Sequence, residues 1–258
     1  MSTRSGVLFF KRILNFSPEA VAAGEKRRNK RYAVGQAFPV KAVLTLTGRD
    51  GEGVKINTPG QAGQDWGAWM LNLSGNGASM QLHPAAVTDR GDVCTMSLTF
   101  GKSTLAIRAR VAHFRATTKF TLCGVSLEFP DAETQKAYLQ VLEPVILGTS
   151  FKPTDSKQVK QDTPDLLKEQ YLGDSGARLT IWRTAADSSI AGFELLVGYH
   201  SITGTPDSDG LDISAIDGAP PAETTAAARE EVTRLVRWIV PNLPKSMPSD
   251  VRKFLARY

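Results

Sequence analysis

The chain has 258 residues, 41% hydrophobic and 22% charged, with a formal net charge of +5, and this length accommodates one large domain or two small ones. No apolar run approaches the ~20 residues that a membrane-spanning helix needs, and the four apolar residues near the start are too few for the core of a signal peptide. Length and composition therefore exclude a helical membrane protein and predict a cytoplasmic one.

The basic residues gather at the N-terminus. Residues 1–35 hold eight Lys and Arg against two Glu, so the rest of the chain carries almost no net charge. We expect residues 1–25 to form a helical segment with short helices over 5–14 and 17–24, the second beginning with a Ser-Pro-Glu start signal. The basic run over residues 26–31 is compatible with a phosphate-bearing partner, but charge alone favours a solvated surface run.

The region that follows alternates apolar and polar residues, as half-buried strands do. Short turns rich in Gly and Asp separate the apolar stretches, and a longer polar loop covers residues 57–65. The predicted strands are 38–47, 66–73, 77–82, 93–100, 105–114 and 121–129. A helix is predicted over 132–147. This spacing favours a mainly β fold, a closed antiparallel barrel of six or seven strands with one closing helix.

The remainder of the chain has a different pattern. Residues 152–166 are polar and contain proline, so we expect a linker. Residues 167–258 predict a smaller α+β domain, which carries no motif of known function. Its predicted strands are 177–183, 190–202 and 211–216, and its helices are 223–240 and 249–258.

Two short motifs in the barrel region carry chemistry. Arg27 and Arg31 form an Arg-x-x-x-Arg spacing just before the first strand, and Asn72, Ser74 and Gly77 form an Asn-x-Ser-x-x-Gly turn between two strands. The planar fork of arginine matches guanine O6 and N7 together and makes charge-assisted bonds to phosphate. Two residues separated by one position share a sheet face, and a glycine lets the backbone approach a ligand closely.

In this order and spacing the two motifs resemble the signature of the PilZ family, whose members bind cyclic di-GMP. A Gly-Val-x-x-x-Phe strand at residues 124–129 adds to the resemblance, which covers roughly residues 26–147. The resemblance implies a PilZ-type β-barrel domain over residues 26–151. The residues that it implies as ligand-binding are Arg27, Arg31, Asn72, Ser74 and Gly77. Lys26 and Arg28 are implied as additional contacts.

The other reactive residues do not form a recognisable site. The histidines are scattered and are interpreted as surface or packing residues: His83, His113 and His200. Cys94 and Cys123 are expected to be buried thiols in a reducing compartment. Since no metal-ligand spacing and no pair of nucleophile and base can be assembled, we expect no metal, no cofactor besides the ligand and no catalysis.

Three hypotheses for function follow from these motifs. In the first, cyclic di-GMP orders the Arg-rich segment against the barrel and thereby alters the domain arrangement or the binding of a downstream protein partner. In the second, the barrel is a protein-docking module that needs no ligand. In the third, the basic N-terminus binds nucleic acid without sequence specificity or a membrane surface, with a strong dependence on salt. Each of them leaves a homodimer open.

Overall fold

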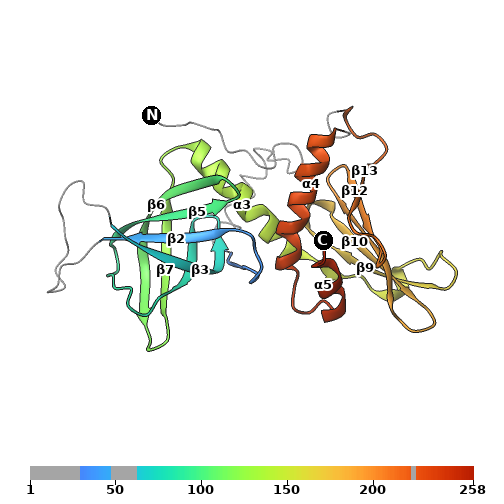
Figure 1. The fold of residues 1–258 in the computed structure, drawn as a ribbon, viewed down its shortest axis with the longest axis horizontal. Helices are drawn as coiled ribbons and strands as arrows, with labels where there is room; N and C mark the ends of the chain where they lie inside the picture. The colour runs from blue at the N-terminus through green and yellow to red at the C-terminus, as the bar shows by residue number, and fades with distance from the viewer. Residues whose placement is uncertain (1–29, 48–62, 222–224) are drawn as a thin grey trace. The chain divides into compact units, whose positions relative to one another are not determined.

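The computed structural model describes residues 30–47, 63–221 and 225–258, which form two compact units (Figure 1). The described part of the first unit comprises residues 30–34 and 39–142, without 48–62. The second unit comprises residues 35–38 and 143–258, without 222–224. The helices expected over 5–14 and 17–24 lie outside the described residues, as do Lys26, Arg27 and Arg28.

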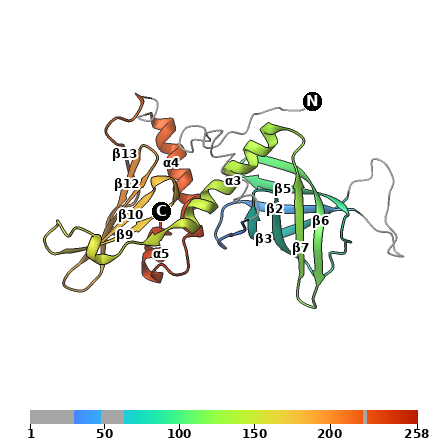
Figure 2. The same ribbon diagram turned by 180° about the vertical axis from the view of Figure 1, so that it is seen from behind.

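The described part of the first unit contains seven strands. They are β1 (Tyr32–Ala33), β2 (Lys41–Leu46), β3 (Gln64–Ser74), β4 (Gly77–Leu82), β5 (Val93–Phe100), β6 (Ser103–Ala116) and β7 (Thr121–Glu128). All neighbours are antiparallel, in the order β3-β2-β5-β6-β7-β4, and β4 returns to pair with β3 (Figures 1 and 2). The short strand β1 lies outside this ring, on β3. The predicted closed antiparallel barrel is therefore confirmed.

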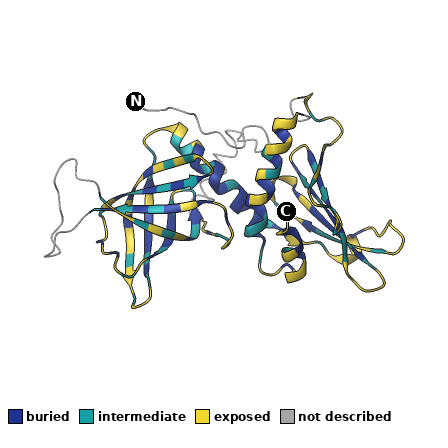
Figure 3. Cartoon of the chain, in the orientation of Figure 1, coloured by how far each residue is buried: buried dark blue, intermediate teal, exposed yellow. Residues whose placement is uncertain are grey.

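The alternating sequence pattern explains why these strands close around a core. In β2 and β5 every second residue is buried, while the residues between them are partly exposed. Figure 3 shows this alternation along the strands of the barrel. Side chains from five different strands are fully buried inside: Leu44, Leu73, Met80, Met96, Leu98 and Ile107. Their burial supplies the hydrophobic stabilisation of the barrel.

Helix α3 (Ala132–Ser150) follows β7 directly. Asp131 accepts a hydrogen bond from the Thr134 backbone N–H at 2.6 Å, which satisfies one of the free donors at the helix start. The helix continues through Pro144 and ends three residues later than predicted. Its residues up to 142 belong to the first unit, and the rest belong to the second unit.

The second unit is an α+β structure, as predicted. Within residues 143–221 and 225–258, six strands form one antiparallel sheet in chain order: β8 (Lys152–Pro153), β9 (Leu166–Leu172), β10 (Arg178–Thr184), β11 (Ile190–Val197), β12 (His200–Gly204) and β13 (Asp212–Ala215). The helices are α4 (Ala226–Ile239) and α5 (Ser249–Leu255). A buried arginine joins the sheet to α5, since Arg183 binds Glu169 at 2.8 Å and Asp250 at 2.6 Å.

The sheet of the second unit is larger than the sequence predicted. The single strand expected over 190–202 is two strands, because the chain turns at Gly198, where φ is +57°. Strand β9 was missed because three successive polar residues, 168–170, interrupt its apolar ends so that no alternation marks it, and its pairing with β10 stabilises it. The residues expected as a linker contain β8 and a short 3-10 turn (Ser156–Gln158). The predicted domain limits, 26–151 and 167–258, stay a prediction.

Residues 35–38 belong to the second unit although β1 and β2, on either side of them, belong to the first. The Gly35 N–H donates to Asn242 Oδ1 at 2.8 Å, and the Phe38 and Trp238 rings meet edge to face at 5.4 Å. A β-carbon on Gly35 would overlap the Pro241 carbonyl. Asn242 is buried, and its side-chain N–H donates to the Trp238 carbonyl at 2.7 Å. This segment is therefore a specific part of the second unit.

Both cysteines are buried free thiols, as predicted. Burial raises the pKa of Cys94 to about 12 and that of Cys123 to about 11. Thiols of this kind are held in the unreactive protonated form.

The described part of the chain shows neither a membrane-spanning helix nor a metal-binding cluster. None of the helices there combines the length and apolar character that crossing a bilayer requires. Nor do the described His, Cys, Asp and Glu side chains form a group of three or more that could hold a metal ion.

Candidate functional site

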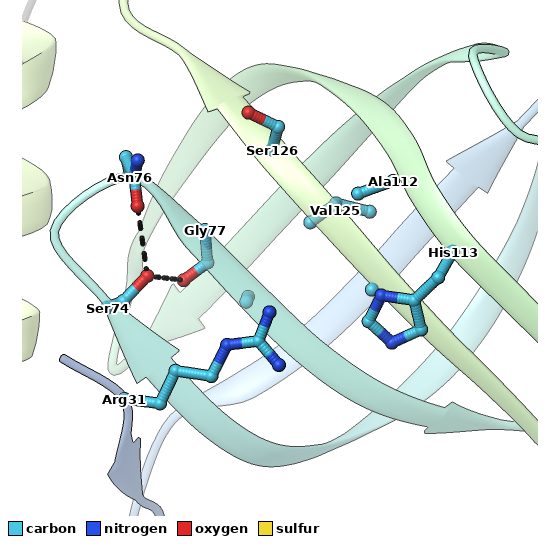
Figure 4. A pocket seen from close by; sticks show the side chains of 10 residues that line it. Arg31, Ser74, Asn76, Gly77, Ala112, His113, Val125 and Ser126 are labelled. Carbon is cyan, nitrogen blue, oxygen red and sulfur yellow. Dashed lines mark hydrogen bonds between the residues drawn. The ribbon is translucent and has the colours of Figure 1, made fainter. Parts of the chain in front are cut away.

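A pocket of about 310 Å³ lies on the outer face of the barrel, beside the turn that joins β3 to β4 (Figure 4). This volume is at the lower end of the range of roughly 300–1,000 Å³ that is typical of small-molecule sites. The lining comes from the residue before β1, from the β3–β4 turn and from β6 and β7. The lining residues are Arg31, Ser74, Asn76, Gly77, Ala78, Ala112, His113, Gly124, Val125 and Ser126.

Strand β1 places Arg31 at this pocket. Tyr32 pairs with Leu73 and Ala33 pairs with Asn72, so the next step of the antiparallel register brings Arg31 opposite Ser74. Tyr32 is buried and anchors the two-residue strand. Figure 4 shows the Arg31 side chain reaching from β1 across the opening of the pocket.

The charge of Arg31 is not compensated within the described residues. None of their carboxylates forms an ion pair with it, and none of them lines the pocket. By contrast, Arg108 and Arg110 on β6 are both held by Glu128, at 3.1 and 2.5 Å. The pocket is therefore suited to an anion, which would receive charge-assisted hydrogen bonds from the guanidinium.

The β3–β4 turn presents polar groups next to this cation. The buried Ser74 hydroxyl lies 3.2 Å from the Gly77 carbonyl and 3.2 Å from Asn76 Oδ1, so its single proton can be donated to either. The Asn76 side chain is exposed, and its backbone carbonyl accepts a hydrogen bond from the Leu127 N–H at 2.9 Å. The turn is thus held from β7 while its side chains face the pocket.

Gly77 is required by the packing of strands rather than by an unusual backbone angle. A β-carbon at this position would lie 2.7 Å from the Val125 carbonyl oxygen on β7. Any other residue would push β4 away from β7 and widen the pocket between them.

The hydroxyl of Tyr138 holds the backbone of the β3–β4 turn by hydrogen bonding. Tyr138 is on α3 and fully buried, and its hydroxyl donates to the Ser74 carbonyl at 2.7 Å, with the Gly77 carbonyl at 3.3 Å. Burial raises the pKa of Tyr138, so the group remains a neutral donor. Helix α3 therefore positions the backbone that carries the polar motif.

The structure brings together some of the predicted ligand residues. Arg31, Ser74 and Gly77 line the same pocket. Asn72 does not line it: this partly exposed residue lies between Ala33 of β1 and Ser79 of β4 in the sheet. The other predicted contacts lie outside the described residues: Lys26, Arg27 and Arg28. The assignment of these residues to a ligand stays a prediction.

Three polar lining residues were not predicted: Asn76, His113 and Ser126. A signal existed for Asn76, which lies inside the Asn-x-Ser-x-x-Gly motif, and for Ser126, which lies inside the Gly-Val-x-x-x-Phe motif. His113 was interpreted as a surface or packing residue, and it is indeed exposed, but its place in the lining of the pocket was not predicted. No local pattern marks it, because only the pairing of β6 with β7 brings it there.

Comparison with known proteins adds little to this picture. No family model matches the chain, and no curated protein matches it. Among solved structures, the chain is similar to the Borreliella burgdorferi PlzA protein in complex with c-di-GMP, at 12% sequence identity and a TM-score of 0.31, over 83% of this chain and 98% of that one. A similarity of that size carries no conclusion on function, which therefore rests on the residues of the site.

Proposed function

We propose that the chain is a PilZ-type receptor for cyclic di-GMP and acts by binding rather than by catalysis. One observation carries the proposal: strand β1 holds the preceding Arg31 beside the Ser74–Gly77 turn, at a pocket where no carboxylate of the described residues pairs with its guanidinium or lines the opening. Cyclic di-GMP offers what such a pocket can bind, namely two phosphodiesters and two guanines whose O6 and N7 match an arginine fork.

In this proposal different motif residues contact different parts of the ligand. Arg31 binds a guanine edge or a phosphate, and Arg27 supplies a second fork of the same kind. The Ser74 hydroxyl and the Asn72 amide contact the ligand from the barrel surface, and Gly77 keeps β4 close to β7. Lys26 and Arg28 are additional contacts in the basic segment, which orders on the ligand at an entropic cost.

The output of binding is proposed to be a change in domain arrangement or in the affinity for a downstream protein. Chain connectivity supports this idea: one residue, Val34, separates β1 from residues 35–38, which belong to the second unit. A ligand that orders the residues before β1 therefore acts on a strand continuous with that unit. Its effect is limited by its differential affinity for the two states.

Isothermal titration calorimetry of the full chain with cyclic di-GMP tests the proposal. We expect binding by the parent protein and a loss of about 1.5–3 kcal/mol, about 10- to 150-fold in Kd, in Arg31→Ala, because a charge-assisted hydrogen bond is lost. Arg90→Ala is the matched control, since Arg90 is exposed on a loop and does not line the pocket. Cyclic di-AMP, which has the same phosphates, should bind more weakly.

Two results would contradict the proposal. If Arg31→Ala binds like the parent, this pocket is not the ligand-binding site. If no heat of binding is measured at tens of micromolar ligand, the result favours a docking module that needs no ligand. A third arm varies the salt concentration. An interaction that disappears with added salt and shows no preference for guanine would indicate nonspecific attraction by the basic N-terminus.

A further inference from the structure

A break in the regular pairing of β6 with β7 places His113 in the lining of the pocket. The register shifts between Val111 and His113, so Ala112 is an extra residue on β6, and His113 is paired with Gly124 on β7. A bulge of this kind redirects the side chain that follows it. Ala112, His113 and Gly124 all line the pocket that contains Arg31.

Gly124 provides the space in which the His113 ring lies. A β-carbon on Gly124 would overlap this ring, and the three nearest atoms to it would be Cε1, Nδ1 and Nε2 of His113. The ring therefore covers the backbone of Gly124, which is buried, while His113 itself is exposed. One side of the imidazole rests on the strand, and the other is open to the pocket.

The position of the ring relative to Arg31 is visible in Figure 4. The guanidinium reaches into the pocket from the β1 side, and the imidazole borders the same space from β6. Both groups are planar, and a nucleobase stacks on aromatic rings and on guanidinium planes.

The His113 ring is available for such a contact. It has no hydrogen-bond partner in the described part of the chain. The other exposed histidine of this unit is different: His83 stacks on Trp66 at 6.0 Å and 15°, and its Nδ1 accepts the Ala85 N–H at 3.2 Å. His83 thus has a structural role, whereas nothing in the described fold employs the open side of His113.

We propose that His113, seated on Gly124, is a stacking platform for one guanine base of the ligand. The proposal rests on cyclic di-GMP binding at this pocket and adds a residue that determines how the base is held. Stacking needs a flat ring, and here the ring can lie against the strand only because Gly124 has no side chain. The two residues therefore act together: His113 provides the flat ring, and Gly124 lacks the β-carbon that would displace it.

Calorimetry with cyclic di-GMP on the full chain tests the role of the ring. We expect His113→Ala to weaken binding by roughly 5- to 150-fold, since a base–aromatic stack is lost. His113→Phe keeps a flat ring and should bind within a few-fold of the parent. His83→Ala is the matched control, an exposed histidine of the same unit away from the pocket, and should leave binding unchanged.

The outcomes separate this proposal from the proposed function. If the parent binds and Arg31→Ala does not, but His113→Ala binds like the parent, the stacking platform is wrong and the receptor stands. If His113→Phe is as weak as His113→Ala, a polar contact of the ring is responsible and the stacking platform is again wrong. If the parent itself does not bind cyclic di-GMP, both proposals fail together.

A second set of variants tests the role of Gly124. Gly124→Ala should weaken binding as much as His113→Ala, because the new β-carbon displaces the ring. Since Gly124→Ala also strains the barrel, its thermal unfolding is compared with that of the double variant His113→Ala/Gly124→Ala. We expect removal of the ring to restore the melting temperature toward that of His113→Ala. A double variant as unstable as Gly124→Ala alone would show that the glycine is needed for another reason and would overturn the pairing.

Discussion

Gly77 shows how a single missing side-chain atom shapes the site. The Asn-x-Ser-x-x-Gly pattern predicts a turn, and the glycine was interpreted as a means of tight turning and close approach to a ligand. In the structure the close approach is to β7, because the Val125 carbonyl occupies the space that a β-carbon would need. The residue therefore shapes the pocket through the distance between two strands.

Substitution of Gly77 is predicted to destabilise the barrel. Gly77→Ala places a carbon 2.7 Å from the Val125 carbonyl oxygen, and the forced movement should lower the free energy of unfolding by about 1–3 kcal/mol. Chemical denaturation monitored by tryptophan fluorescence measures this change. Gly67→Ala is a matched control on β3, where a β-carbon would meet no described atom within 4 Å. Equal stability of the two variants would contradict the explanation.

At the scale of elements, the site depends on helix α3 as well as on the strands. The β3–β4 turn carries the polar motif, yet its backbone is fixed by Tyr138 on the helix and by the Leu127 N–H on β7. Both contacts are made to carbonyl groups of the turn, so they determine where the Ser74 hydroxyl points. A motif in one hairpin thus acquires its geometry from two other elements.

The hydroxyl of Tyr138 is predicted to matter for both stability and binding. Tyr138→Phe leaves the Ser74 carbonyl without its buried donor, which should cost about 1–3 kcal/mol in unfolding free energy. Because the turn is then held less firmly, the affinity for cyclic di-GMP should also fall, which calorimetry measures.

The control for this variant is Tyr199→Phe, which removes an exposed hydroxyl in the second unit. We expect it to change neither quantity. A Tyr138→Phe protein with the stability and the affinity of the parent would show that the helix does not position the turn.

At the scale of the whole molecule, the path of the chain connects the two units close to the candidate site. The polypeptide leaves the barrel after β1, contributes residues 35–38 to the second unit and returns to the barrel for β2. The Gly35 N–H is held there by Asn242, a residue 207 positions away. The strand that presents Arg31 is therefore tied covalently to a segment with its own specific contacts.

This path predicts that ligand binding is sensed at Gly35. If cyclic di-GMP orders the residues around β1, opening of the adjacent segment should become less favourable, and the Gly35 amide should exchange its hydrogen more slowly. Amide exchange followed by nuclear magnetic resonance measures this effect. In Asn242→Ala, which lacks the acceptor, the Gly35 amide should lose this response while the amides of β3 and β4 keep theirs.

A second capped amide in the same unit is the control. The Asp174 N–H is held by the Ser150 hydroxyl at 2.8 Å and is not connected to β1. Its exchange should be unaffected by ligand. A saturating ligand that leaves the Gly35 amide unchanged, or that slows both amides equally, would argue against transmission through residues 35–38.

Local patterns in the sequence were sufficient for much of the fold and for three of the residues that line the candidate site. Alternation predicted the barrel strands, because one face of each strand must be buried. The motif spacing identified Arg31, Ser74 and Gly77, which the structure places at one pocket. Strand β9 was missed because its apolar and polar residues are grouped rather than alternating, and its pairing with β10 stabilises it instead.

The sequence by itself determined the strands of the barrel, the α+β character of the second unit and the motifs that contain three residues of the pocket, since alternation and short motifs involve residues close together in the chain. Only the tertiary structure decided that β1 aligns Arg31 with Ser74, that a bulge seats His113 on Gly124, and that Gly35 meets Asn242. The physical reason is that these contacts depend on strand register and on packing between distant segments, where a shift of one residue turns a side chain to the opposite face.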